Sequence, residues 1–326
     1  MKASISIIVC FYNAGDKLYK TCDSIKGLLF DDLENVEVIF VNNNSNDNSV
    51  EIINNLFESF SLFPWKIVNE PKPGLSYARL KGIESSHYEY LLFCDDDNWL
   101  SKDYLQIGSK ILQNDSMIAV LGGKGAAVSE IELPVWFEQN KNFFAVGKQF
   151  TESGQVKGYR NVVYGAGMFV RKSAFQFLIS KGFQFYNLGR TGKKLTSGED
   201  SEMCLAFQIA GYKIWYEEEL TFQHYIEEKR LKDDYLEKLK KGMEESSFVS
   251  RFYRDFLNGY VPKITHYFWI KEIVYSVIDF FRLIIKKNKK EEINRNIKFI
   301  FYLLKRRGKY NQDVKKIINT CNSICN

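Results

Sequence analysis

The chain has 326 residues and a formal net charge of +5, and its 45% hydrophobic and 15% aromatic content describes a globular protein with a substantial core. No segment reaches the roughly 18 uncharged apolar residues that a membrane-spanning helix needs. The N-terminal run "ISIIVCFYN" lacks the small-residue cleavage site of a signal peptide. We therefore expect a cytoplasmic protein, either free or at the inner face of the cell membrane.

The first hundred residues alternate strands with amphipathic helices. Apolar runs predict strands over residues 4–12, 36–43, 65–70 and 88–95, and the segments between them predict helices over 16–29, 45–60 and 75–86. Continuous apolar strands that alternate with helices are typical of a parallel sheet covered on both faces. The fold class is thus α/β, with a mostly parallel, Rossmann-like sheet.

Polar residues follow three of these strands: Phe11-Tyr12-Asn13, Asn42-Asn43-Asn44 and Asp95-Asp96-Asp97. Ligands of parallel sheets bind at the carboxyl ends of the strands. We therefore expect these residues to converge on one crevice.

The rest of the chain divides into a mixed region and a helical region. Strands "MIAVLGGKG" and "GAGMFVRK", the loop "NLGRTGKKLTSGED" and the helix "EDSEMCLAFQIAGY" lie between about residues 118 and 225. The loop is either an ordinary exposed loop or a lid over a ligand. After about residue 228 the pattern is all-helical.

Three adjacent carboxylates at a strand end, Asp95-Asp96-Asp97, have three interpretations. They could cap the next helix, although Ser101 could do so without them. They could be solvated surface charge, although an apolar run leads directly into them. They could also bind Mg²⁺ or Mn²⁺, which prefer oxygen ligands and often share substrate phosphates with carboxylates.

Six motifs in order resemble the family 2 glycosyltransferases, which are inverting enzymes of the GT-A fold. The motifs, within residues 3–225, are "SIIVCFYN", "EVIFVNNNSNDNS", "KPGLSYARLKGI", "FCDDDNWL" (the DxD region), "GAGMFVRK" and "GEDSEMCLAFQIAGYKIWY". Each motif alone is weak evidence, but six in the right order are strong evidence.

The resemblance implies a role for each matching residue. It implies that Asp95, Asp96 and Asp97 bind the donor's ribose and its metal-bridged diphosphate. The metal is Mn²⁺ or Mg²⁺, with Asp97 as the most direct ligand and Asp95 and His224 beside it. The donor would also meet Tyr12 at the base, Asn13, Asn42 and Asn44 at the strand ends, and Arg79. Asp200 matches the catalytic base, and Glu199 stands next to it.

Simpler interpretations exist for several of these residues. His224 could satisfy a buried hydrogen bond, and Arg79 could lie on a helix surface. Glu199 and Asp200 begin a helix, where acidic side chains favour the positive end of the helix dipole.

Two features qualify the resemblance. Many relatives have Asp at the uracil-contacting position where this chain has Asn42, and the family's Asn after Ala-Arg is here Leu80. Asn42 can still donate and accept hydrogen bonds, so a UDP-sugar remains the expected donor. The Gln-x-x-Arg-Trp sequence of processive synthases does not occur, which favours a single sugar addition.

The C-terminal part is basic and amphipathic: residues 261–326 contain 15 Lys and Arg and 5 Asp and Glu. Apolar residues recur at helical spacing at 270, 273, 274, 277, 278, 281, 284 and 285, and again at 293, 297, 300 and 304. These helices either pack on the catalytic domain or a second subunit, or they lie in the plane of an anionic membrane. Nucleic-acid binding fits poorly, because no base-reading motif accompanies the charge.

The sequence predicts a catalytic domain over residues 1–227, with a nucleotide-sugar half (1–100) and an acceptor half (101–227), and a helical extension over 228–326. The expected function is metal-dependent, inverting transfer of one hexosyl or N-acetylhexosaminyl group to a glycan or lipid-linked glycan in surface polysaccharide biosynthesis. The alternatives are a sugar-nucleotide nucleotidyltransferase and a non-catalytic sugar-binding protein on the same fold.

Overall fold

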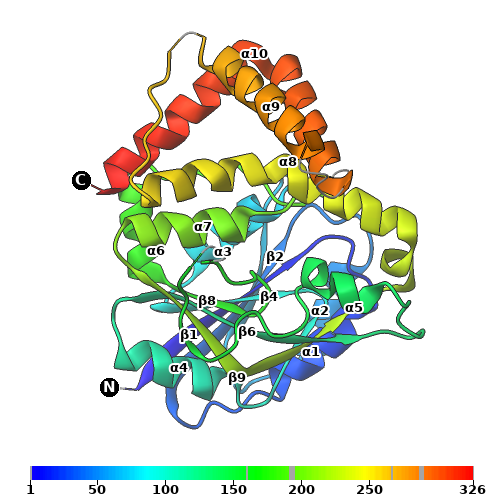
Figure 1. Cartoon of the computed structure of the whole chain (residues 1–326). Helices are drawn as coiled ribbons and strands as arrows, with labels where there is room; N and C mark the ends of the chain where they lie inside the picture. Colours follow the sequence, from blue (N-terminus) through cyan, green and yellow to red (C-terminus); the bar gives the residue numbers. More distant parts are fainter. Residues whose placement is uncertain (1, 159–160, 191–194, 266, 286–289, 326) are drawn as a thin grey trace.

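The computed structural model describes residues 2–158, 161–190, 195–265, 267–285 and 290–325. Within these residues the strands form a single nine-stranded mixed sheet with helices on both faces (Figure 1). The α/β fold class expected from the sequence is confirmed. The predicted helical extension is present as well.

The first four strands are parallel and lie in the order β3-β2-β1-β4. They are β1 (Ala3–Phe11), β2 (Leu33–Asn42), β3 (Trp65–Asn69) and β4 (Tyr90–Asp95). The register pairs Phe11 with Asn42 and Cys10 with Asp95, so the three polar strand ends meet at one edge of the sheet. The apolar runs of β1, β2 and β4 are buried on both faces, as continuous hydrophobic strands predict.

Two sets of helices cover the sheet. One face carries α1 (Lys17–Lys26), α2 (Ser49–Phe57) and α4 (Tyr104–Asn114), and the other carries α3 (Leu75–Ser85), α6 (Lys172–Ser180) and α7 (Glu199–Ile209). Helix α3 lies so close to β1 that a Cβ on Gly82 would be 2.3 Å from Ile8 Cγ2. This close approach packs the second half of α3 against the middle of β1.

The second half of the sheet contains both strand directions. It comprises β5 (Asn98–Leu100), β6 (Ile118–Val128), β7 (Gly154–Gln155), β8 (Met168–Arg171) and β9 (Lys213–Tyr225). Strand β8 runs antiparallel to both β4 and β6, whereas β9 runs parallel to β6. Strand β5 pairs with β9 so that Asn98 faces His224, which brings His224 beside the aspartates. The short helices α5 (Phe137–Asn140) and η1 (Lys141–Phe144) lie between β6 and β7.

The C-terminal part is all-helical, as the sequence indicates: η2 (Glu228–Leu231), α8 (Asp233–Leu257), α9 (Phe268–Ile285) and α10 (Lys290–Cys325). Helix α8 crosses α7, and the second half of α10 joins the same core through residues such as Tyr310, Val314 and Ile317 (Figure 1). Helix α9 runs beside α10 on the side away from the sheet. None of the helices in the described ranges combines the length and the apolar character needed to cross a membrane.

Candidate active site

A cavity of about 950 Å³ opens at the carboxyl edge of the parallel strands. It lies between the ends of β1, β2 and β4, the start of α7, the end of β9 and the helix η2. Most of the residues predicted from the sequence line it: Tyr12, Asn44, Arg79, Asp95, Asp96, Asp97, Glu199, Asp200 and His224. The expected convergence on one crevice is therefore observed for these residues.

The other two predicted residues, Asn13 and Asn42, hold neighbouring loops and are not among the described residues that line the cavity. The Asn42 side chain donates to Asn69 Oδ1 (3.1 Å) and accepts from the Ser45 N–H (2.8 Å). Asn13, with a φ of +47°, accepts from the Asn46 N–H (2.9 Å). Both amides thus connect the loops after β1, β2 and β3.

Asn43 is an additional structural residue that the sequence did not single out. Its buried side chain donates to the carbonyls of Glu70 (2.9 Å) and Lys72 (2.7 Å) and accepts from the Gly74 N–H (2.9 Å). These three bonds hold the segment before α3 against the end of β2. It belongs to the Asn42-Asn43-Asn44 run at the strand end, but nothing in the sequence distinguished it from its neighbours.

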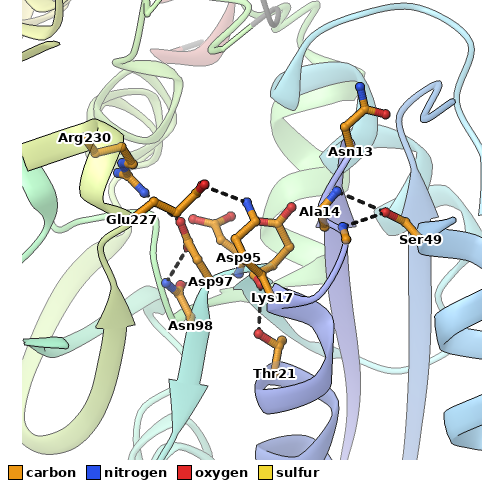
Figure 2. A network of polar contacts seen from close by, with 12 residues as sticks. Asn13, Ala14, Lys17, Thr21, Ser49, Asp95, Asp97, Asn98, Glu227 and Arg230 are labelled. Carbon is orange, nitrogen blue, oxygen red and sulfur yellow. Dashed lines mark hydrogen bonds and ion pairs between the residues drawn. The ribbon is translucent and has the colours of Figure 1, made fainter. Parts of the chain in front are cut away.

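Each of the three aspartates at the end of β4 has its own cationic partner. Asp95 Oδ1 lies 3.6 Å from Arg79 Nη2, and Asp96 Oδ1 lies 3.6 Å from Lys17 Nζ. Asp97 Oδ2 lies 2.8 Å from Arg230 Nη1, and Figure 2 shows Arg230 directed toward Asp97. The repulsion among three adjacent carboxylates is therefore relieved by three separate cations.

The three carboxylates differ in acidity. Burial raises the pKa of Asp96 to about 6, although Lys17 partly offsets that effect. Burial also acts to raise the pKa of Asp97, but His224 and Arg230 together hold that pKa well below its usual range. Asp97 is thus ionised at neutral pH, which makes its pair with Arg230 a full ion pair.

His224 has a defined orientation beside Asp97. Its Nδ1 lies 2.6 Å from the carbonyl oxygen of Phe144, which can only accept, so Nδ1 carries the hydrogen. The other nitrogen, Nε2, lies 3.3 Å from Asp97 Oδ2 and 3.5 Å from Arg230 Nη1. The alternative that His224 satisfies a buried hydrogen bond is therefore correct, but the same ring also faces the aspartates.

The predicted metal ligands Asp95, Asp97 and His224 do not form a metal-binding group in this arrangement. In the described ranges no cluster of three or more His, Cys, Asp and Glu side chains is placed to hold a metal ion. Asp95 is paired with Arg79, and the Arg230 guanidinium contacts both Asp97 and His224. A divalent cation would have to displace Arg230 to reach these two side chains. The residues present therefore do not fit Mn²⁺ or Mg²⁺.

Glu199 and Asp200 lie at the start of α7, across Arg79 from Asp95. Arg79 is buried, at 3% exposure, and its Nη1 lies 3.5 Å from Glu199 Oε1. The alternative that Arg79 lies on a helix surface is wrong. Burial, reinforced by the charge of Asp200, raises the pKa of Glu199 to about 7.

Asp200 is positioned by two backbone donors. Its Oδ2 accepts from the Gly165 N–H (2.9 Å) and its Oδ1 from the Ser201 N–H (2.7 Å). Each oxygen keeps a further lone pair, so the carboxylate can still accept a proton from a bound hydroxyl.

Lys17 and Arg230 are among the cavity residues that were not predicted from the sequence. Lys17 lies 3.4 Å from Glu227, so it joins the segment before η2 to the aspartates (Figure 2). Arg230 follows His224 by six positions, in "HYIEEKR", but the sequence assigns it to the helical extension that begins at 228. Only the folded chain brings it to Asp97.

The loop that could be a lid falls partly outside the described residues, because 191–194 are not among them. Arg190 and Leu195, on either side of that gap, both line the cavity.

Residues 6–178, more than half of the chain, match the family described as Glycosyl transferase family 2. The glucosyl-dolichyl phosphate glucuronosyltransferase of Haloferax volcanii is 21% identical over 244 residues, which are 71% of this chain and 72% of that protein. Relatives from Bacillus subtilis and Streptococcus pneumoniae are matched over only 28% and 16% of their own length.

Solved structures share the fold at low sequence identity. The Staphylococcus aureus TarS 1-349 structure in complex with UDP-GlcNAc has a TM-score of 0.55 at 15% identity, and the match covers 100% of this chain and 90% of TarS 1-349. The GalNAc-T7 structure with UDP, GalNAc and Mn²⁺ has a TM-score of 0.51 at 14% identity, with 69% of this chain and 44% of that chain covered. The expected GT-A fold is thereby confirmed. On the match of residues 6–178, the chain belongs to glycosyl transferase family 2.

Proposed function

We propose that the protein transfers one sugar from a UDP-sugar to a hydroxyl group of a glycan or a lipid-linked glycan, with inversion at the anomeric carbon. The observation that carries this proposal is a single cavity lined both by Asp95, Asp96 and Asp97 and by Asp200. One part can receive a nucleoside diphosphate, and the other can receive an acceptor hydroxyl. The sugar is a hexose or an N-acetylhexosamine.

The donor would lie along the strand ends. Tyr12, with 48% exposure, offers an open aromatic face to the base at the end of β1. The diphosphate would find cationic side chains in the cavity wall, among them Lys17, Arg79 and Arg230. Charge-assisted hydrogen bonds from such groups are the strong contacts of phosphate recognition.

The transfer step needs one base. The acceptor oxygen forms a bond to the anomeric carbon while the bond from that carbon to the diphosphate oxygen breaks, and the nucleoside diphosphate leaves with the electron pair. The acceptor's proton passes to Asp200. The bonds from Gly165 and Ser201 hold the Asp200 carboxylate in one orientation. Metal ions enter no step of this proposal, because the Arg230 guanidinium contacts both Asp97 and His224, and Asp95 is paired with Arg79.

The acceptor is proposed to be part of a surface polysaccharide or its lipid-linked precursor. The name of the Haloferax relative, which includes a dolichyl phosphate, supports a lipid-linked acceptor. A second feature is the exposed apolar surface of the α9–α10 hairpin, which includes Val274, Phe281, Ile285 and Phe301. Basic residues are abundant in the same segment.

We propose that this hairpin surface contacts an anionic membrane, since apolar side chains bordered by Lys and Arg match such a surface. The contact would bring the cavity to the inner face of the cell membrane, where a lipid-linked acceptor would be available.

A panel of nucleotide-sugars tests the central proposal. Incubation of the protein with UDP-, GDP- and CDP-sugars, without an acceptor, should give slow release of UDP from one UDP-sugar, because water replaces the acceptor hydroxyl. Calorimetric titration with UDP, GDP and CDP provides an independent measure of base preference. If the protein hydrolyses none of these nucleotide-sugars and binds none of these nucleotides, the proposal is contradicted.

A further inference from the structure

Arg230 differs from the other cations of the cavity in its burial and its contacts. It comes from η2, outside the sheet, and is 4% exposed. Its Nη1 contacts the carboxylate of Asp97 at 2.8 Å and Nε2 of His224 at 3.5 Å. These are the two side chains whose free electron pairs would otherwise be available to a metal ion.

The orientation of His224 supports this interpretation. Since Nδ1–H donates to Phe144, the ring turns its other nitrogen, Nε2, toward both Arg230 Nη1 and Asp97 Oδ2. The other carboxylate oxygen of Asp97, Oδ1, accepts a hydrogen bond from the Asn98 side chain at 3.1 Å. Arg230 therefore lies in a prepared cation site.

Within the described residues, Arg230 contacts Asp97 and His224 through Nη1. Nε and Nη2 of Arg230 are buried and, within the described residues, have no hydrogen-bond partner. Arg230 also lines the cavity, together with Asp96 and Lys17. Buried N–H groups without an acceptor are costly, and a shift of the guanidinium toward an anionic ligand in the cavity would give them oxygen acceptors.

The rings of Phe144 and Tyr235 restrict the guanidinium, because each ring centre lies 5.9 Å from Cζ. The pair of Glu227 with Lys17 holds the start of the same segment over the aspartates (Figure 2). Arg230 thus contacts Asp97 from a position fixed by neighbouring residues, and not as a mobile side chain at the surface.

From these contacts we infer that Arg230 is the resident cation of the site and binds the diphosphate of the donor in place of a divalent metal ion. This inference rests on the proposed function. It implies that a nucleoside diphosphate binds without metal and that the contact depends on the β-phosphate.

Calorimetric titration with UDP and with UMP, in EDTA and in Mn²⁺, tests the inference. Wild-type protein should bind UDP in EDTA with an affinity within about 3-fold of that in Mn²⁺. The loss of one charged contact would lower the affinity by about tenfold, which is a clearly larger change. Arg230→Gln should weaken UDP binding in EDTA by about 10- to 100-fold. The affinity for UMP should change much less, because UMP lacks the β-phosphate.

Two further variants guard against a trivial loss of structure. Lys232→Gln removes a nearby exposed positive charge, which lies 3.8 Å from Glu228 and is not among the residues that line the cavity, and should leave UDP affinity nearly unchanged. Asp97→Asn removes the carboxylate but retains Arg230. UDP binding in EDTA should therefore persist in Asp97→Asn, whereas a metal ligand at this position would make the variant lose Mn²⁺-dependent binding.

Three results would overturn the inference: wild-type binding of UDP only in Mn²⁺, equal losses for UDP and UMP in Arg230→Gln, or no loss at all. If no nucleotide binds under any condition, the proposed function itself fails, which is a distinguishable outcome.

Discussion

Asp200 shows how one residue can lie at a helix start and still be available for chemistry. Helix N-termini favour acidic side chains through the helix dipole, so the position alone does not indicate a base. Its carboxylate, however, accepts from Gly165 in a neighbouring segment and faces the cavity shared with the aspartates. The cavity position, rather than the helix position, supports the catalytic proposal.

Replacement of Asp200 by Asn tests this residue. The change keeps the shape and one acceptor oxygen but removes the base, so transfer should fall at least about 100-fold. UDP affinity should remain close to wild type, because the base acts on the acceptor hydroxyl. Initial rates of transfer and calorimetric titration with UDP measure the two effects separately.

The matched control is Glu51→Gln, which removes an exposed acid from the first turn of α2, away from the cavity. It should leave transfer unchanged. Full activity in Asp200→Asn would reduce Asp200 to a helix-terminal acid and make Glu199 the next candidate. A collapse of UDP affinity would instead assign Asp200 to donor binding.

At the scale of elements, the contact of α3 with β1 sets the position of Arg79. Gly82 allows this approach, because a Cβ there would lie 2.3 Å from Ile8 Cγ2 in the core. Arg79 is one helical turn earlier on α3 and reaches both Asp95 and Glu199. A shift of α3 would therefore move a cation of the site.

Gly82→Ala should destabilise the protein despite the better helix propensity of Ala. Overpacking of a filled core costs about 1–3 kcal/mol, whereas the gain in propensity is at most about 1 kcal/mol. Urea unfolding measures the change in the free energy of unfolding. Gly27→Ala, where the nearest atom would lie at 3.5 Å, serves as the control and should change little. A Gly82→Ala protein more stable than wild type would contradict the packing.

The α9–α10 hairpin gives a second prediction at this scale. Phe281 and Phe301 are 58% and 67% exposed and both border a groove between the two helices. The full-length protein should co-sediment with liposomes that contain phosphatidylglycerol, and added salt should weaken the binding. The double variant Phe281→Glu/Phe301→Glu should bind at least about 100-fold more weakly, because burial of each ring is worth about 1.5–3 kcal/mol.

Leu62→Glu, an exposed apolar position near β3 on the body of the protein, is the control for a general effect of added charge. If the wild-type protein does not co-sediment with these liposomes, the membrane proposal is contradicted. Concentration-dependent self-association that the double variant abolishes would instead assign the hairpin to a second copy of the chain.

At the scale of the whole molecule, the sequence predicted what depends on local pattern. The spacing of apolar residues identified strands β1 to β4 and their helices, and the resemblance to the family identified the strand-end residues. The partners of the aspartates could not be predicted, because Lys17, Arg79 and Arg230 come from three distant segments. Arg230 was assigned to the extension because the pattern after about residue 228 is all-helical and rich in Lys and Glu.

The core likewise extends across the expected division at residues 227 and 228. Glu202, on α7, is fully buried and accepts from the N–H groups of Tyr186 and Asn187 and from the hydroxyl of Tyr253 on α8. Burial raises the pKa of Glu202 to about 8. This side chain therefore links the sheet domain to the C-terminal helices in a pH-dependent manner.

The sign of this dependence follows from the raised pKa. The folded protein binds the Glu202 proton more tightly than the unfolded chain does, so this contribution to stability is complete below the ordinary Glu pKa and is lost as the pH rises toward 8. The free energy of unfolding should consequently fall between pH 5.5 and 8.5. In Glu202→Gln, the side chain at position 202 cannot ionise, so the free energy of unfolding should fall by at least about 1 kcal/mol less than in wild type. This lower bound corresponds to a pKa shift of less than one unit. Glu199, with its pKa raised to about 7, should maintain part of the slope in the variant.

Urea unfolding at both pH values measures the difference, and Glu84→Gln, at a 73% exposed side chain paired with Lys81, should retain the wild-type slope. Equal slopes in wild type and Glu202→Gln would mean that Glu202 does not couple α7 to α8 through its proton.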